Sequence, residues 1–342
     1  MNIFFGIQFI EWKVGLFNNR GVKIHNKEIS IAYGPVPSRR LGQSLGINNI
    51  PPKICTYSCV YCQLGRTLNM QIKREEFYKS EKVIRDVKKK VKKAKEQGEV
   101  IDYLTFVPDG EPTLDVNLGM EIELLKDLGI KVAVITNGSL LFEEKVRNDL
   151  YKADWVSVKI DSNSQKIWRK VNRPYGSLKH HEILNGIQEF SSNFTGELVT
   201  ETMLVQGVND IPEEIEKIAG IINGLNFKKN YLAIPTRPPA EDWVKAPTEE
   251  FLNTAYQIFQ ENSINVEYLV GYEGNAFAFT GNVKSDLLSI TSVHPMRKDG
   301  VEEYLKKANA DWLEIEELIN SGELIEVEYN NKRFYLRKLH KN

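Results

Sequence analysis

The chain has 342 residues, of which 42% are hydrophobic and 27% are charged, as in an ordinary globular protein of about two domains. Its formal net charge of −1 excludes a global electrostatic attraction to nucleic acid or to an anionic membrane. No apolar run approaches the ~18 residues of a membrane-spanning helix, and the N-terminus lacks the basic start and small-residue cleavage site of a signal peptide. We therefore expect a cytoplasmic protein that does not enter a membrane.

All three cysteines lie in one short segment. Residues 1–30 form an N-terminal extension to which we assign no function. Cys55, Cys59 and Cys62 form a C-x3-C-x2-C pattern in a stretch without helical periodicity. Three thiolates can hold three corners of an iron–sulfur cube and leave the fourth iron open to a small ligand. A disulfide would leave an odd thiol, and none of the five histidines is close enough in sequence to suggest a zinc site. A carboxylate could still complete a zinc site, so that alternative stays open.

The chain beyond the cysteines alternates short β-rich segments with longer segments of helical periodicity. This alternation predicts an α/β fold in which helices cover a parallel sheet. In such sheets, ligands gather beyond the C-terminal ends of the strands. The predicted strands are 44–49, 103–106, 131–135, 155–160, 198–204 and 231–234, and the predicted helices are 79–98, 115–128, 142–152, 179–191, 212–224 and 247–262.

Polar residues stand at the ends of several predicted strands. The second strand is followed by Asp109-Gly110-Glu111, the third by Asn137, and the fourth ends in alternating polar residues that include Lys159 and Asp161. Structural roles are the simpler alternative: Glu111 can cap a helical turn at Pro112, Asn-Gly is a common turn, and Lys159 can pair with Asp161. The positions nevertheless make these residues candidates for binding a cofactor.

The cysteine spacing resembles the signature of the radical S-adenosylmethionine (SAM) enzymes, over about residues 31–280. The segment 109–111 resembles their Gly-Gly-Glu motif, with Asp109 in place of the first glycine. Residues 34–42, 59–65 and 109–114 look like a radical SAM group often labelled "Fe–S oxidoreductase" and related to the wyosine-tRNA synthases. Those synthases use a second cluster held by extra cysteines, which this chain lacks.

The resemblance implies a partial (β/α)6 barrel over residues 31–284. It implies that the three cysteines bind a 4Fe–4S cluster whose free iron is chelated by SAM, and that residues 109–111 hold the SAM ammonium group. Asp161 would then bind the ribose, Lys159 the SAM carboxylate, and Asn137 would lie nearby. Reductive cleavage of SAM would give a 5′-deoxyadenosyl radical that abstracts hydrogen from the substrate, with flavodoxin or ferredoxin as the low-potential electron donor.

The last segment, residues 285–342, changes character and resembles a winged-helix module. Predicted helices at 299–308 and 311–321 precede two strands, 324–329 and 333–337, joined by a turn at Asn330-Asn331. The acidic second helix and the basic hairpin leave two substrate classes open, an RNA base or a peptide or protein. A non-catalytic cluster-binding or electron-transfer protein is a third class. Arginines at positions 39, 40 and 237 suggest an anionic substrate, with ordinary salt bridges as the alternative.

Overall fold

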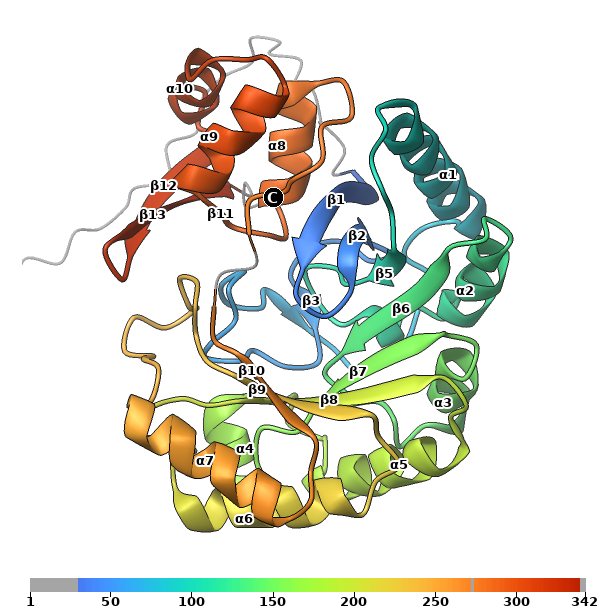
Figure 1. The fold of residues 1–342 in the computed structure, drawn as a ribbon. Coiled ribbons are helices and arrows are strands. Elements are labelled where there is room, and N and C mark those ends of the chain that lie inside the picture. Colours follow the sequence, from blue (N-terminus) through green and yellow to red (C-terminus); the bar gives the residue numbers. More distant parts are fainter. Residues whose placement is uncertain (1–29, 272–273, 339–342) are drawn as a thin grey trace, which may run out of the picture.

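The computed structural model describes residues 30–271 and 274–338, and its centre is a strongly curved eight-stranded sheet (Figure 1). The strand order is β1-β2-β5-β6-β7-β8-β9-β10, with β1 antiparallel to β2 and every other neighbouring pair parallel. The strands are β1 (Ala32–Ser38), β2 (Gly42–Ile47), β5 (Tyr103–Phe106), β6 (Lys131–Thr136), β7 (Trp155–Lys159), β8 (Glu197–Met203), β9 (Lys229–Ala233) and β10 (Val266–Leu269).

Alternation along each central strand separates an outer layer from the barrel interior, because successive side chains of a strand point to opposite faces. Val132 and Val134 of β6 pack outward in the main core, whereas Ala133 faces inward. The same parity places Trp155 of β7 and Val199 of β8 in the inner cluster. The interior is therefore a packed core at one end, and the inward positions further along β7 and β8 include the polar residues Lys159 and Glu201.

Helices cover the outer face of the sheet and bury their apolar stripes against it (Figure 1). Each follows a strand except α5, which follows α4, so that the connections largely repeat the strand–helix unit. The helices are α1 (Ser80–Glu96), α2 (Leu118–Lys126), α3 (Glu144–Leu150), α4 (Gln165–Val171), α5 (His180–Asn193), α6 (Pro212–Asn223) and α7 (Glu249–Glu261), with a short 3-10 turn η1 (Pro112–Leu114).

The predicted partial barrel is confirmed, and all six predicted strands and six predicted helices of the barrel are present. Two strands extend the sheet beyond the prediction, namely β1 at one edge and β10 at the other. The short helix α4 was also not predicted. The N-terminal extension lies outside the described residues, apart from Ser30.

The C-terminal segment forms a smaller unit that packs on β1. It contains α8 (Val283–Thr291), β11 (Met296–Arg297), α9 (Lys298–Lys307), α10 (Leu313–Asn320), β12 (Leu324–Tyr329) and β13 (Lys332–Arg337), with the three strands in one antiparallel sheet. The predicted helices and hairpin are present, and Asn330 and Asn331 both adopt positive φ in the turn. The resemblance to a winged-helix module stays a prediction.

This small unit shares its core with the barrel. Tyr33 and Val36 of β1 are buried among its apolar residues, which include Phe277, Met296 and Tyr304. The domain boundary placed between residues 284 and 285 falls within α8 and stays a prediction. Strand β1 therefore belongs both to the barrel sheet and to the core of the C-terminal unit.

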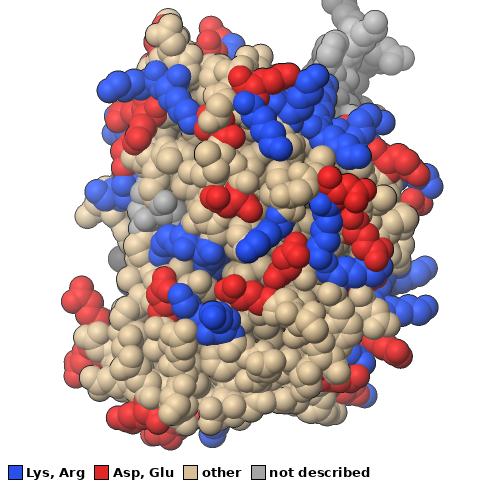
Figure 2. Space-filling view, turned by 45° about the vertical axis from the view of Figure 1, so that its right-hand side comes forward, with Lys and Arg blue, Asp and Glu red and all other residues tan. Residues whose placement is uncertain are grey.

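Charged residues are intermixed on the face that Figure 2 shows. Lys and Arg side chains alternate with Asp and Glu over its upper and middle parts, and its lower part is mostly uncharged. This face presents no extended field of one sign. Within the described residues, none of the helices combines the length and the apolar character that crossing a membrane requires.

Candidate functional site

The cysteines lie on a long irregular loop that follows β2 and crosses the C-terminal ends of the parallel strands. Its backbone is fixed by neighbouring segments: the amide of Ser58 donates to the carbonyls of Asn172 and Arg173, and that of Val60 donates to Val171. Val60 is fully buried in an apolar cluster with Val171 and Val244. The loop therefore has a defined position over the barrel although it has little regular secondary structure.

Two of the three thiols accept hydrogen bonds from side-chain amides. Asn137 Nδ2 lies 3.6 Å from Cys55 Sγ, and Asn172 Nδ2 lies 3.5 Å from Cys59 Sγ. Burial raises the pKa of all three thiols, that of Cys59 to about 12. The thiols therefore stay protonated at neutral pH until a cation stabilises the thiolates.

The donor set fits a cluster better than a single ion. Among the described residues, which include all three cysteines, no three His, Cys, Asp or Glu side chains are arranged to hold one metal ion. In a cube each thiolate binds a different iron, so three thiols of an iron–sulfur site need not converge on one point.

The segment after β5 packs directly against the cysteine loop. Gly110 approaches the carbonyl oxygen of Ile54 so closely that an added Cβ would lie 1.9 Å from it, and the amide of Glu111 donates to the same oxygen at 3.1 Å. Only glycine fits there, because any side chain would push the two segments apart. Asp109 is buried and pairs with Lys53 at 3.2 Å, and burial outweighs Lys53 to raise the pKa of Asp109 to about 6.

Glu111 holds several elements together through its buried carboxylate. It accepts hydrogen bonds from Thr113 N and Oγ1, from Thr136 Oγ1 at 2.6 Å and from Asn137 N at 2.8 Å. The cap role weighed from the sequence is thus present, and the same carboxylate fixes the end of β6. Asn137 is positioned by this contact and turns its side-chain amide to Cys55 and to Thr56 Oγ1.

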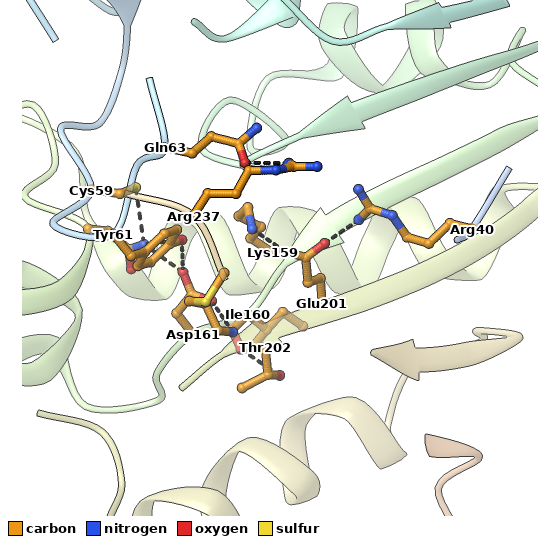
Figure 3. Close-up of polar contacts among 12 residues, drawn as sticks. Arg40, Cys59, Tyr61, Gln63, Lys159, Ile160, Asp161, Glu201, Thr202 and Arg237 are labelled. Carbon is orange, nitrogen blue, oxygen red and sulfur yellow. Dashed lines mark hydrogen bonds and ion pairs between the residues drawn. The ribbon is translucent and has the colours of Figure 1, made fainter. Parts of the chain in front are cut away.

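Lys159 faces the barrel interior but does not pair with Asp161 as the simpler alternative supposed. Its ammonium group lies 2.5 Å from Glu201 Oε1, and Arg40 pairs with the other carboxylate oxygen (Figure 3). Glu201 is buried, yet Lys159 and Arg40 outweigh the effect of burial and lower its pKa to about 2. Arg40 therefore forms an ordinary salt bridge, with Glu201, which was the alternative to a role in binding an anionic substrate.

Asp161 is fixed by three groups of the protein. Its carboxylate accepts from the hydroxyl of Tyr61, from Asn172 Nδ2 at 2.7 Å and from the amide of Met203 at 2.8 Å (Figure 3). Asn172 thus lies between Asp161 and the Cys59 thiol. This links the end of β7 to the cysteine loop.

Arg237, from the loop after β9, links the C-terminal unit to the same region. Its guanidinium donates to Gln63 Oε1 at 2.6 Å and lies 2.9 Å from His294 Nε2. Gln63 directly follows the third cysteine, and its amide nitrogen lies 3.5 Å from the carbonyl of Val293. Two of the three arginines suggested as anion-binding groups, Arg40 and Arg237, thus have partners within the protein.

The structure brings all the predicted site residues to one end of the barrel and adds residues that the sequence did not indicate. Glu201 was missed because it lies within a strand with no motif around it. The available signal was its position in the alternating pattern of β8, which points its side chain into the barrel, as the pattern of the neighbouring strand does for Lys159. Asn172 lies in an Asn-Arg-Pro segment, and nothing in that segment indicates a contact with a thiol.

Comparisons of the sequence and of the fold with known proteins point to the same family. Residues 49–220 match the model of the Radical SAM superfamily. The chain is 48% identical over 313 residues to UPF0026 protein MJ1312 of Methanocaldococcus jannaschii, covering 91% of this chain and 97% of that protein. It is 24% identical over 247 residues to ribosomal RNA large subunit methyltransferase N of Nitrosopumilus maritimus, covering 68% and 66%. A radical SAM methyltransferase from Sphaerobacter thermophilus has a similar fold, with TM-score 0.55, 16% identity and 66% of each chain covered.

Proposed function

This chain belongs to the radical SAM superfamily, and from that premise we propose that it is an enzyme whose Cys55, Cys59 and Cys62 hold a 4Fe–4S cluster. The predicted class of enzyme and its cofactor pair, a 4Fe–4S cluster and SAM, agree with this membership. One observation carries the assignment to these residues: three thiols lie on one fixed loop over the strand ends, with amide donors at two of the sulfurs. When bound and reduced, the cluster supplies the electron that cleaves SAM into methionine and a 5′-deoxyadenosyl radical.

The residues of this chain then have distinct roles. Gly110 lets the segment 109–111 approach the cysteine loop, where its backbone carbonyls and Asp109 suit the ammonium group of SAM. Lys159 and Asp161, fixed by Glu201 and Asn172, provide a cation for the SAM carboxylate and an acceptor for its ribose. Asn137 donates to the Sγ atom of Cys55, and hydrogen bonds to a ligand sulfur tune the reduction potential of a cluster.

The substrate that these features favour is an RNA base. The relative from Nitrosopumilus maritimus is named as a ribosomal RNA methyltransferase. The hairpin of β12 and β13 adds exposed basic residues, Lys332, Arg333 and Lys338, which suit phosphates. Copurified RNA that salt releases steeply would support this class.

A peptide or protein substrate is the second candidate, and helix α10 favours it. Glu316 is exposed on that helix, and Glu314 and Glu317 pair with Lys284 at its edge. Acidic side chains there would repel phosphates and would suit a basic peptide. Absence of bound RNA at low salt, together with radical-dependent change in a peptide, would favour this class.

The test of the proposed function is anaerobic reconstitution with iron and sulfide. We expect the EPR signal of the reduced protein to change when SAM is added, and 5′-deoxyadenosine to form. Cys59→Ala should lose both the cluster signal and the product, whereas a protein that binds zinc alone, or whose cluster ignores SAM, would contradict the proposal.

A further inference from the structure

The outward side of the cysteine loop carries a group of large side chains that solvent reaches. Leu68 is 65% exposed, Trp243 45% and Tyr175 37%, and the side chains of Arg66 and Arg173 are 67% and 40% exposed. We call these five residues the cysteine-loop face. Two arginines around exposed apolar and aromatic groups match the composition of an interface with another molecule.

Hydrogen bonds show that the face is continuous although its residues come from three segments. Thr67, between Arg66 and Leu68, donates its amide to Ser58 Oγ and its hydroxyl to the carbonyl of Tyr57. On the other side of residues 56–58, the amide of Tyr175 donates to Thr56, and the amide of Ser58 donates to Arg173. The stretch between Cys55 and Cys59 therefore lies directly between the two halves of the face.

The third segment is attached through Glu241. Its amide donates to the carbonyl of Val60, and its carboxylate pairs with Arg66 at 2.8 Å and with Arg173 at 2.5 Å. Glu241 is buried, so the two guanidiniums extend from a fixed anchor. Trp243 follows Glu241 by two residues, and its side chain is exposed.

The segments bordering the face are strongly basic. Residues 63–74 contain three Lys or Arg, of which Arg74 is largely buried and pairs with Asp149, and residues 165–181 contain five; neither segment has an Asp or Glu. Residues 235–246 contribute two basic residues and two acidic ones, Glu241 and Asp242, and so leave this excess of positive charge unchanged. A partner that docks here is therefore favoured if its surface is acidic.

The position of the face limits what that partner can do. Thr56 and Ser58 underlie the face, and each is next to a cysteine assigned to the cluster. From the strand ends, Asp161 accepts a hydrogen bond from the hydroxyl of Tyr61, and the ammonium group of Lys159 lies over the ring of Tyr61, so both residues contact the barrel side of the same loop. A molecule on the outward face is thus close to the cluster but separated from the substrate side by the loop itself.

We propose that the cysteine-loop face is the docking surface for an acidic low-potential electron-transfer protein of the flavodoxin class. The inference rests on the proposed function, since it requires the cluster. The donor loses one electron and the cluster gains it, with no bond made or broken. Such complexes are small and transient, and charge accelerates their association in a salt-dependent way.

The test compares two ways of reducing the same enzyme. SAM cleavage is measured with dithionite, a small reductant that needs no docking surface, and with reduced flavodoxin, in wild type and in the variants Arg66→Ala and Leu68→Asp. We expect at least a fivefold lower rate with limiting flavodoxin in each variant, and an unchanged rate with dithionite. Raising salt should slow the flavodoxin-driven reaction of the wild type more than that of Arg66→Ala.

Matched controls lie on another face. Arg85 has the same side-chain exposure as Arg66, 67%, and Val100 is 63% exposed, so Arg85→Ala and Val100→Asp should leave both rates unchanged. Equal rates with flavodoxin in wild type and in the Arg66 and Leu68 variants would overturn the docking surface and leave the proposed function standing. Variants that lose RNA binding but keep the flavodoxin rate would assign the face to RNA instead. No cleavage with dithionite in the wild type would overturn the proposed function itself.

Discussion

Lys159 and Glu201 occupy facing positions of β7 and β8, and their side chains form an ion pair inside the barrel with Nζ and Oε1 2.5 Å apart. Arg40, from the turn between β1 and β2, contacts the second oxygen of the same carboxylate. One buried anion thus connects both halves of the curved sheet. It also fixes the ammonium group that we assign to the SAM carboxylate.

Replacing Glu201 by glutamine should therefore destabilise the protein. Glu201→Gln keeps the size of the side chain but leaves two largely buried cations without their anion, which costs about 3–5 kcal/mol in comparable cases. Urea unfolding measures the change. Glu267→Gln is the control, because Glu267 also bridges neighbouring strands by pairing with Lys229, but its side chain is 48% exposed. A loss under about 1 kcal/mol is expected there, and equal losses in the two variants would contradict the argument.

The contribution of Glu201 should depend on pH in the acid range. Lys159 and Arg40 lower its pKa from 4.5 to about 2 against the effect of burial. Its stabilisation is therefore fully present above pH 4.5 and is lost as the pH falls toward 2. The difference in unfolding free energy between wild type and Glu201→Gln should shrink between pH 5 and pH 3. A difference that stays constant over this range would show that the charge of Glu201 is not responsible.

Glu121 on α2 should give the opposite pH dependence. Burial, and then the neighbouring Asp115, raise its pKa to about 9, so the folded protein keeps this carboxyl protonated while the unfolded chain ionises it above about pH 4.5. Its folded state therefore loses stability as the pH rises from 4.5 to 9. Glu121→Gln should stabilise the protein by on the order of 5 kcal/mol at pH 8, because each pH unit above 4.5 contributes about 1.4 kcal/mol, and by little at pH 4.

The control for this effect lies on the same helix. The side chain of Glu123 is 58% exposed and pairs with Lys152. Glu123→Gln should change stability by less than about 0.5 kcal/mol at either pH. Urea denaturation at pH 4 and pH 8 separates the two variants, and a Glu121→Gln protein that is no more stable at pH 8 would refute the assignment.

Asn137 should raise the reduction potential of the cluster. Its amide donates to Cys55, and a donor stabilises the more negative reduced state. Removing one hydrogen bond of about 1 kcal/mol corresponds to a decrease on the order of 50 mV in Asn137→Ala. An EPR-monitored redox titration measures it, with the exposed Asn193→Ala as control. A potential that does not fall would show that the contact at 3.6 Å has no electrostatic effect.

The barrel could be predicted because its signals are local. Apolar strands and amphipathic helices alternate along the chain, and period-two patterns already placed Lys159 and Asp161 on one face of a strand. Strand β10, with the sequence Val-Glu-Tyr-Leu, was missed because four residues carry too little pattern, and only pairing with β9 makes them a strand.

The partners within the site could not be predicted, because they depend on contacts between distant segments. Arg40 and Glu201 are 161 positions apart, and Arg237 and His294 are 57 apart. A sequence shows that an arginine is present but not whether a carboxylate of the same chain already occupies it. The polar residues at the strand ends were found for the opposite reason, since parallel strands bring those ends to one edge whatever the connections.

Strand β1 pairs with β2 in the barrel sheet and also supplies Tyr33 and Val36 to the core of the C-terminal unit. An exchange of the C-terminal unit between proteins would consequently disturb the first hairpin of the barrel, on which the cysteine loop depends. The barrel and the C-terminal unit should therefore unfold in one calorimetric transition. A barrel fragment from which a protease has removed the residues beyond 282 should aggregate. The C-terminal unit and the barrel should for this reason unfold together as one cooperative unit.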